Sequence, residues 1–411
     1  MTAVSPSVTA SRAPVRRTHR RRLTIAGEAT GTFWLIAAIV TVLNMVGLVM
    51  VMSASSVTSL RETGSTWSYF ERQAAWTMLG VVALFTFLTV DVGFWRRHAR
   101  VWLLGSFALL ALVLVPGVGV NVNGATRWLG YGPIQIQPAE LVKFALLIWV
   151  ADLLDRRRDH MDDVGWTLYP VLAYLGVAAG LIMLQPNLGT TIIIATMVMA
   201  MLWAAGTPAA PLTLTGLAGA ALATYAVAST PFRRRRFFAF LDPMKDPGNT
   251  GYQTVQSMVG LADGGLFGKG LGASRAKWGF LPYAHTDFIF AIIGEEFGLL
   301  GAFMVVVLFG ALGLLGLIVA ARARDRFSLL VAIGITAWLM VQAAVNIGAV
   351  IGLMPITGVP LPFVSFGGSA LVVNLAATGL LLNIARHPIE PAPRRRDRDA
   401  GAARRRVDAG R

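Results

Sequence analysis

Long runs without a charged residue set the strongest limit on how this chain can fold. The two longest runs cover residues 164–232 and 327–385. A helix needs about 20 apolar residues to cross the hydrocarbon core of a bilayer, so each run predicts more than one membrane span. Only 14% of the residues are charged, against about 25% in soluble domains. This composition excludes an ordinary soluble enzyme.

Prolines and glycines divide the runs into ten predicted spans. Gln185-Pro186-Asn187 and Gly206-Thr207-Pro208 interrupt the longest run, and a Pro-rich loop at 352–370 interrupts the next. Proline and glycine end helices, so the boundaries fall there. The predicted spans are 33–52, 74–90, 101–120, 139–154, 164–184, 188–205, 209–230, 288–320, 327–347 and 369–385. We therefore expect an all-α integral membrane protein with ten transmembrane helices and a large extracytoplasmic loop, 230–286, between spans seven and eight.

Basic residues predict the orientation of the spans. The N-terminal tail, the end of the chain from Arg386, and the loops near Arg96, Arg156 and Arg322 hold 24 of the 36 lysines and arginines. Cytoplasmic segments carry such an excess, so both termini are predicted to be cytoplasmic. The net charge of +15 then reflects topology and attraction to anionic lipid, and we expect no nucleic-acid partner. The predicted domains are a basic cytoplasmic tail (1–30), the ten-span membrane domain (31–388) and a basic, disordered cytoplasmic tail (389–411).

Four consecutive arginines, Arg233 to Arg236, break this charge rule. They follow three spans after the last cytoplasmic cluster, so they should face outside. One explanation is a miscounted span. The other is an anion site at the outer membrane surface, because arginine recognises phosphate through planar, multi-donor contacts. The same outer loop holds Lys269, Arg275 and Lys277 among many glycines, which expose backbone N–H donors.

Acidic residues near the start of the eighth predicted span are the second unusual feature. Asp287 ends the outer loop, and Glu295 and Glu296 follow within the span. A carboxylate at a helix start can simply cap the helix or interact favourably with its dipole. A buried carboxylate within a span is instead expensive and marks a functional site by default. The two glutamates can equally form structural pairs with Lys143, Arg127 or a helix end, and both interpretations stay open.

Three outer segments share an unusual composition for this chain. Residues 117–140, 230–286 and 352–370 are rich in glycine or proline yet contain many apolar residues. Irregular backbone at membrane depth is tolerated only where it is buried in protein or lines a cavity. These segments therefore predict a roofed cavity at the outer face.

Five sequence blocks that lie in or overlap these segments point to one family. The first is GATRWLGYGPIQIQPAELVKFAL, and GYQTVQS, GGLFGKGLGAS, LPYAHTDFIFAIIGEEFGLLG and MPITGVPLPFVSFGGSA follow in order. Together they resemble the shape, elongation, division and sporulation (SEDS) family of bacterial cell-wall proteins, which contains FtsW, RodA and SpoVE. The resemblance covers roughly residues 30–388, which is nearly everything except the tails.

The resemblance implies a peptidoglycan glycosyltransferase. Members of this family polymerise lipid II into glycan strands at the outer face of the bacterial plasma membrane. They work with a class B penicillin-binding protein, an FtsI-like transpeptidase that crosslinks the product, and with other divisome membrane proteins. The essential carboxylate of the family is the aspartate of its HTDF motif, which is Asp287 here.

One carboxylate is enough for this chemistry. A sugar hydroxyl attacks an anomeric carbon with inversion and expels a lipid pyrophosphate, which leaves readily, whereas glycosidases need two carboxylates. Asp287 would accept the hydroxyl proton. Cationic groups or a divalent cation, Mg²⁺ or Mn²⁺, would stabilise the negative charge of the leaving pyrophosphate. No organic cofactor is expected. The candidate substrate-binding residues are Arg127, Glu140, Lys143, Arg233, Arg235, Arg236, Lys269, Arg275, Lys277 and His285.

Two details of the resemblance leave roles open. Glu140 and Lys143, at i and i+3, can form a structural ion pair or position lipid II. Asn187 stands where the family usually has aspartate, before the sixth span. Asparagine keeps the capping function, but any role of that carboxylate in binding an ion or a partner is weakened.

Three alternatives for the function remain. A lipid II flippase is possible because intramembrane charges and broken helices also suit transport. A scaffold that recruits the transpeptidase is another, and it would tolerate Asp287→Asn. Within the family, the long basic tails and the FLDPMKDP stretch favour the division (FtsW) branch over the elongation (RodA) branch, and hence a location at the division septum.

Overall fold

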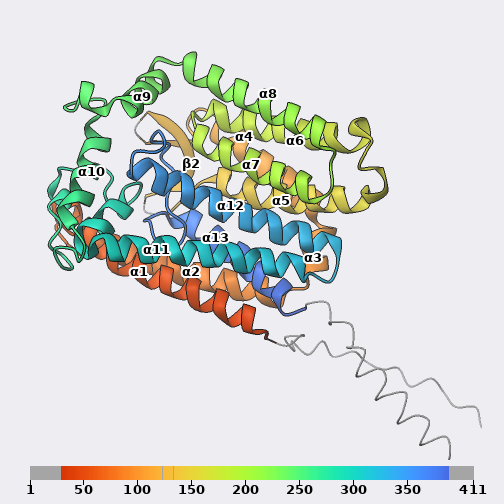
Figure 1. Ribbon diagram of the computed structural model, residues 1–411, viewed down its shortest axis with the longest axis horizontal. Helices are drawn as coiled ribbons and strands as arrows, with labels where there is room; N and C mark the ends of the chain where they lie inside the picture. Colours follow the sequence, from red (N-terminus) through yellow and green to blue (C-terminus); the bar gives the residue numbers. More distant parts are fainter. Residues whose placement is uncertain (1–28, 123, 133, 388–411) are drawn as a thin grey trace, which may run out of the picture.

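Long helices that run side by side make up most of the protein (Figure 1). The computed structural model describes residues 29–387 except 123 and 133, so the predicted tails lie almost wholly outside the described residues. The helices are α1 (Gly31–Thr63), α2 (Ser68–Thr89), α3 (Val92–Arg97), α4 (Ala99–Val113), α5 (Pro138–Arg156), α6 (Val164–Leu184), α7 (Leu188–Ala204), α8 (Ala209–Ala228), α9 (Pro231–Leu241), α10 (Tyr252–Gly264), α11 (Ile289–Ala321), α12 (Arg326–Val350) and α13 (Gly368–Ala385).

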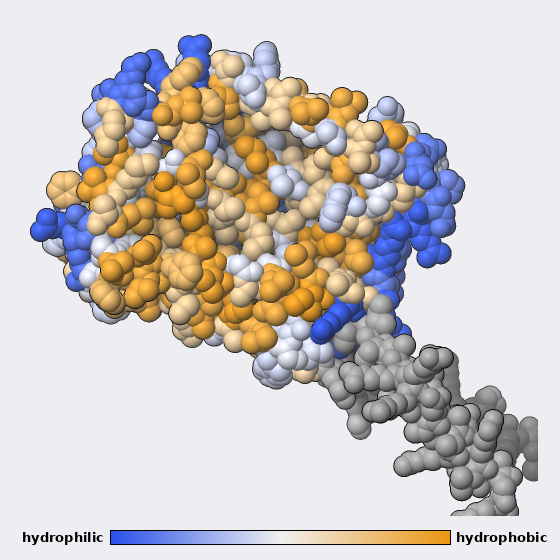
Figure 2. Space-filling model, viewed as in Figure 1, coloured by the Kyte–Doolittle hydropathy of each residue, from blue (hydrophilic) through white to orange (hydrophobic). Residues whose placement is uncertain are grey.

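Each predicted span overlaps one of the longer helices. Within the described residues, six helices are long and apolar enough to cross a membrane by length and composition: α1, α6, α8, α11, α12 and α13. Helices α4 and α7 are apolar but shorter. Figure 2 shows exposed apolar side chains covering the middle of the molecule, with hydrophilic residues gathered towards its two ends. The chain is therefore a mostly helical, multi-span membrane protein.

A small antiparallel sheet corrects the all-α assignment. Helix α4 ends at Val113, earlier than the predicted span 101–120, and the chain then forms β1 (Gly119–Val122), β2 (Ala125–Tyr131) and β3 (Ile134–Ile136) in the order β1-β2-β3. The sequence Asn123-Gly124 is a hairpin signature, because both residues tolerate the positive φ that a tight turn requires. Gly124 has φ 76°. The predicted spans were drawn from uncharged runs alone, so they missed this hairpin signature.

The sheet and the outer-loop helices lie at one end of the molecule. In Figure 1, β2, α9 and α10 are all at the left. The described chain begins and ends at the opposite end, where the Thr30 hydroxyl donates to the Ala385 carbonyl at 3.3 Å. The two ends of the described chain therefore lie close together.

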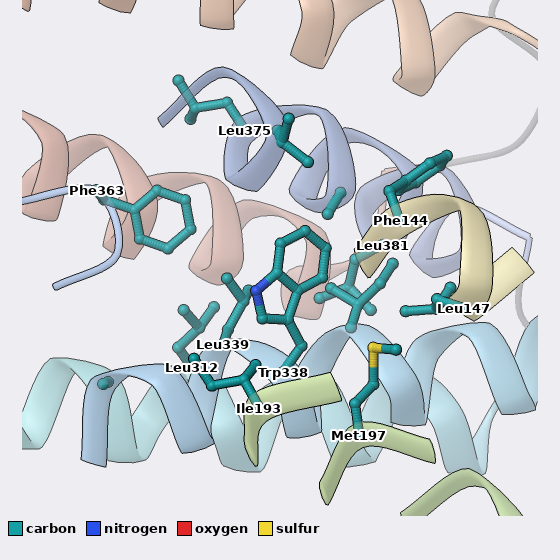
Figure 3. Packing of buried hydrophobic residues seen from close by; sticks show 14 of the residues in the cluster. Phe144, Leu147, Ile193, Met197, Leu312, Trp338, Leu339, Phe363, Leu375 and Leu381 are labelled. Carbon is teal, nitrogen blue, oxygen red and sulfur yellow. The ribbon is translucent and has the colours of Figure 1, made fainter. Parts of the chain in front are cut away.

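Helix α12 lies at the centre of the bundle. Its Trp338 is fully buried, and Figure 3 shows the indole among apolar side chains such as Phe144, Leu147 and Met197 from α5 and α7. Helix α8 is the opposite case, because none of its residues is buried. The core therefore gathers around α12, and α8 is peripheral.

Helix α11 is interrupted, which the continuous span predicted at 288–320 did not anticipate. Gly298 has φ 69° and ψ −167° inside the helix, a conformation that glycine adopts without strain. The amides of Lys269 and Gly270 each donate at 3.0 Å to the carbonyls of Glu295 and Glu296, respectively. The loop that follows α10 thus docks onto the opened turn of α11 through backbone hydrogen bonds.

Candidate active site

Asp287 lies in the turn that leads into α11, beside the Pro-rich loop between α12 and α13. The N-cap residue of α11 is Phe288, so the capping interpretation of Asp287 is wrong. The Asp287 carbonyl accepts a hydrogen bond of 2.9 Å from the side-chain amide of Asn346. A Cβ placed on Gly358 would be 3.7 Å from Asp287 Oδ2. The carboxylate therefore faces a loop residue that has no side chain.

Arg127, on the sheet, acts on this carboxylate through its charge. It lies on β2, and its Nε and Nη2 donate to the carbonyls of Gln185 and Pro186 at 2.8 and 2.6 Å. Those two carbonyls belong to the turn between α6 and α7, which thus fixes the guanidinium. Arg127 and Asp287 influence each other's pKa, so the sheet supplies a held positive charge to the site.

Helix α9 supplies the other arginines. Arg233 and Arg236 are half-buried, one helical turn apart, whereas Arg234 and Arg235 are exposed. Residues at i and i+3 share a helix face, so α9 turns Arg233 and Arg236 inward and the other pair outward. The charge of Arg236 acts on Asp287, whereas that of Arg233 acts on Arg127. The site thus brings together Asp287, Arg127 and Arg236 of the predicted set, with Arg233 near Arg127, but not Arg235.

The electrostatics of the site suit a base. Burial raises the pKa of the Asp287 carboxyl to about 6, although the charges of Arg236 and Arg127 oppose that shift. Burial also lowers the pKa of both guanidiniums, and the Asp287 charge opposes this. Arginine stays protonated in proteins. Asp287 is therefore ionised at neutral pH yet more basic than an ordinary aspartate, which favours proton acceptance.

His285 belongs to an aromatic cluster next to the site. Its ring centroid lies 4.8 Å from that of Tyr69 and 5.7 Å from that of Phe366, and its carbonyl accepts from the Phe366 amide at 3.0 Å. Burial lowers the pKa of the imidazole to about 4, so the ring is neutral at physiological pH. These contacts fix the segment that carries Asp287, and they leave the predicted substrate contact of His285 untested.

Lys269 and Lys277 do not join Asp287. Lys269 Nζ lies 2.6 Å from Asp263 Oδ2 and 3.7 Å from Glu295 Oε1, and Lys277 Nζ lies 3.6 Å from Glu296 Oε1. Both glutamates are buried, so the lysines neutralise charges within α11. Glu295 and Glu296 thus take structural partners, but different ones from Lys143 and Arg127.

Arg275 takes part in the same cluster through its backbone. Its amide donates to Glu295 Oε1 at 2.8 Å, while its side chain is exposed. The guanidinium is therefore accessible at the surface.

Glu140 and Lys143 form the ion pair that their spacing allows. Lys143 Nζ lies 2.8 Å from Glu140 Oε2, and both side chains are buried. The ammonium also donates to Gln342 Oε1 at 2.9 Å and lies 4.7 Å from the Trp338 ring. The pair is thus enclosed by α5 and α12.

Asn187 keeps the capping function expected of it. It is the N-cap of α7, and its Oδ1 accepts from the Thr190 amide at 3.2 Å. A side-chain oxygen that accepts from the N3 amide is the usual N-cap arrangement, which asparagine and aspartate form about equally well. The turn that holds Arg127 therefore does not need the aspartate.

The sequence interpretation missed Gln342 and Asn346, which lie on α12 at i and i+4 and are buried. Polar side chains inside an apolar span are rare and usually face the interior of the bundle, so their spacing was a usable signal.

Among the described residues, no group of three His, Cys, Asp or Glu side chains could hold a metal ion. The protein alone thus offers a divalent cation few ligands there.

Comparison with known proteins decides the family. The model described as cell cycle protein, covering FtsW, RodA and SpoVE, matches residues 33–389. The chain belongs to this family. The resemblance drawn from the five sequence blocks is thereby confirmed.

Individual relatives cover most of the chain. The probable peptidoglycan glycosyltransferase FtsW of Mycobacterium tuberculosis is 41% identical over 365 residues, which are 89% of this chain and 70% of that protein. Stage V sporulation protein E of Bacillus subtilis is 38% identical over 354 residues, 86% of this chain and 97% of that protein.

Solved structures share the fold. A chain from a peptidoglycan synthase complex, studied for the coordination of polymerization and crosslinking, has a TM-score of 0.71 at 30% identity and covers 88% of this chain and 98% of its own length. Rod shape determining protein RodA of Thermus thermophilus has a TM-score of 0.64 at 29% identity, with 89% and 99% covered.

Proposed function

We propose that this chain polymerises lipid II into glycan strands at the outer face of the bacterial plasma membrane, with Asp287 as the general base. It is a peptidoglycan glycosyltransferase of the FtsW type, as its relatives are named. The observation that carries the role of Asp287 is a carboxylate whose pKa is raised to about 6 by burial and which faces arginines from two separate elements. Such a site combines a base with anion-binding groups.

The reaction follows from that pairing of charges. The acceptor sugar hydroxyl gives its proton to the Asp287 carboxylate as its oxygen attacks the anomeric carbon of the donor. The bond to the lipid pyrophosphate breaks on the opposite face, so the anomeric centre inverts. Arg127, Arg233 and Arg236 stabilise the pyrophosphate charge that develops.

The remaining predicted cations serve outer parts of the substrate in this proposal. Arg235, Lys269 and Arg275 are exposed and can contact its sugar or phosphate groups, whereas Lys277 is buried against Glu296. A divalent cation, Mg²⁺ or Mn²⁺, would supply Lewis acidity to the pyrophosphate. Phosphate and water oxygens would supply its ligands, which Mg²⁺ accepts.

The proposed topology has ten crossings with both termini cytoplasmic. Helices α2, α4, α5 and α7 complete the set begun by the six that qualify by length and composition. Their place in the bundle supports this count, since α2 packs along α13, α4 along α5, and α7 along α12. The sheet, α9, α10 and Asp287 would then face the outside, where lipid II is polymerised.

A class B penicillin-binding protein is the proposed partner, together with other divisome membrane proteins at the septum. A chain of similar fold has been solved in a peptidoglycan synthase complex. Relatives named FtsW support the division role over the elongation role.

Glycan polymerisation from labelled lipid II tests the proposal. The purified protein with its partner transpeptidase should make polymer, and Asp287→Asn should make none. Asp242→Asn is the matched control, because Asp242 is exposed at the end of α9 and should keep full activity. Equal polymer from wild type and Asp287→Asn would favour the scaffold. Movement of lipid II across vesicles without polymer would favour the flippase.

A further inference from the structure

Helix α12 carries a polar stripe along its most buried face. Trp338, Gln342 and Asn346 lie at intervals of four residues, and the latter two are 0% and 2% exposed. Residues four apart are about 40° apart around a helix, so all three point the same way. Buried amides must be hydrogen-bonded, so the partners of this stripe identify what it holds.

Asn346 joins two segments that are distant in sequence. Its Nδ2 donates to the carbonyl of Asp287 at 2.9 Å and to the carbonyl of Val359 at 2.8 Å. The amide cannot be reversed, because its oxygen would then face both carbonyls. One side chain therefore fixes the backbone of Asp287 relative to the loop between α12 and α13.

Gln342 fixes the next residue of the same loop. Its Nε2 donates to the Pro360 carbonyl at 2.9 Å, and its Oε1 accepts from Lys143 Nζ and Trp338 Nε1, each at 2.9 Å. This segment of the loop lies between helices α12 and α13, so its carbonyls need donors from elsewhere. The stripe supplies them and connects the loop to the Lys143–Glu140 pair.

The held loop is the one that faces the catalytic carboxylate. Gly358 adjoins Asp287 Oδ2, and Val359 and Pro360 follow it directly. A loop anchored at 359 and 360 holds Gly358 in place, and the bond to the Asp287 carbonyl holds the carboxylate opposite.

We infer that Asn346 is a positioning residue that sets the placement of the Asp287 carboxylate by hydrogen bonding its backbone carbonyl together with that of Val359. The inference rests on the proposed role of Asp287 as the base. Asn346 does not touch the reacting atoms. A misplacement of about 1 Å in a catalytic group costs on the order of 100-fold in rate, so the loss of Asn346 lowers kcat and leaves KM nearly unchanged.

Asn346→Leu tests this inference, with Asn383→Leu as its control. Leucine has the same branched arrangement of side-chain heavy atoms as asparagine but cannot donate. Asn383 on α13 has the same bonding, since its Nδ2 donates to the carbonyls of Phe87 and Val90 at 3.0 and 2.8 Å. Those carbonyls end α2, on the other side of the bundle from the site. Both variants thus lose equivalent bonds, and only one loses contact with Asp287.

Polymerisation kinetics per folded molecule, measured across pH, give the readout. We expect kcat of Asn346→Leu to fall about 100-fold, with a shifted pH midpoint, while Asn383→Leu stays within about threefold of wild type. Wild-type kcat and midpoint in Asn346→Leu, or an equal loss in both variants, would overturn the inference. If Asn346→Leu gives no folded protein, Asn346→Ser keeps a single short donor and should show the same loss of kcat, and wild-type kcat there would also overturn it.

Asp287→Asn in the same assay separates this inference from the proposed function. An active Asp287→Asn would refute the role of Asp287 and the inference with it. An inactive Asp287→Asn beside a fully active Asn346→Leu would overturn the inference alone.

Discussion

The buried pair of Glu140 and Lys143 allows a quantitative test of whether these charges hold the bundle together or bind substrate. Lys143 Nζ and Glu140 Oε2 are 2.8 Å apart, and the two residues are 1% and 3% exposed. At that distance and an effective dielectric constant of about 20, their Coulomb attraction is about 6 kcal/mol. Most of it offsets the desolvation of the two charges.

Lys143→Met removes one charge and leaves the other buried. Breaking a buried ion pair from one side costs about 3–5 kcal/mol. At about 2 °C per kcal/mol for a large domain, the Tm should fall by roughly 6–10 °C. Glu140→Gln combined with Lys143→Met removes both charges, and a neutral pair in a packed interior is close to wild type in stability. The double variant should therefore recover most of the lost Tm.

Two measurements on the same samples decide whether the pair is structural or binds lipid II. They are thermal unfolding of the purified protein and glycan polymerisation from lipid II. A structural pair predicts that Tm and polymerisation fall together in Lys143→Met and recover together in the double variant. A double variant with wild-type Tm and no polymer would refute this reasoning and assign the charges to lipid II. So would a Lys143→Met variant that keeps its Tm and loses activity.

Three further predictions follow from the site. Polymerisation should be lost as the pH falls through about 6, since the Asp287 pKa is near that value and a base must be ionised; a flat pH–rate profile from pH 5 to 8 would contradict it. Arg236→Ala should move that midpoint upward by roughly 1 unit, because a positive charge that lowers the Asp287 pKa is lost, whereas Arg235→Ala should not move it. Gly264→Ala should lower stability in thermal unfolding by about 1–3 kcal/mol, because its Cβ would collide with the Gly294 carbonyl, whereas Gly219→Ala, with open space around it, should not.

The sequence was a better guide to the chemistry of this protein than to the arrangement of its side chains. Uncharged runs located the long helices, and the motif blocks singled out Asp287. Charge alone could not separate Arg236, which turns towards Asp287, from Arg235, which is exposed, because that depends on how α9 is rotated.

The same limit applies to the lysines and to the amides. In the sequence, Lys269 and Lys277 were candidate substrate-binding cations in the same way as the arginines. The structure pairs them with Glu295 and Glu296 of α11. Asn346 carries no charge, and its importance lies in two carbonyls that are 59 and 13 residues away. Contacts of that range depend on the packing of several helices, which periodicity does not report.

The docking of the α10–α11 loop onto α11 also constrains the order in which this protein is built. During synthesis the loop at 265–278 emerges before the turn of α11 that accepts its amides, so it stays without those partners until the next helix has been inserted. Asp287 depends in the same way on Asn346 and Gly358, which are made later still. A chain that stopped before α12 would already contain Arg127 and Arg236, yet the bond from Asn346 to the Asp287 carbonyl would be missing. Catalytic competence is therefore a late event in biogenesis, reached only when the final helices arrive.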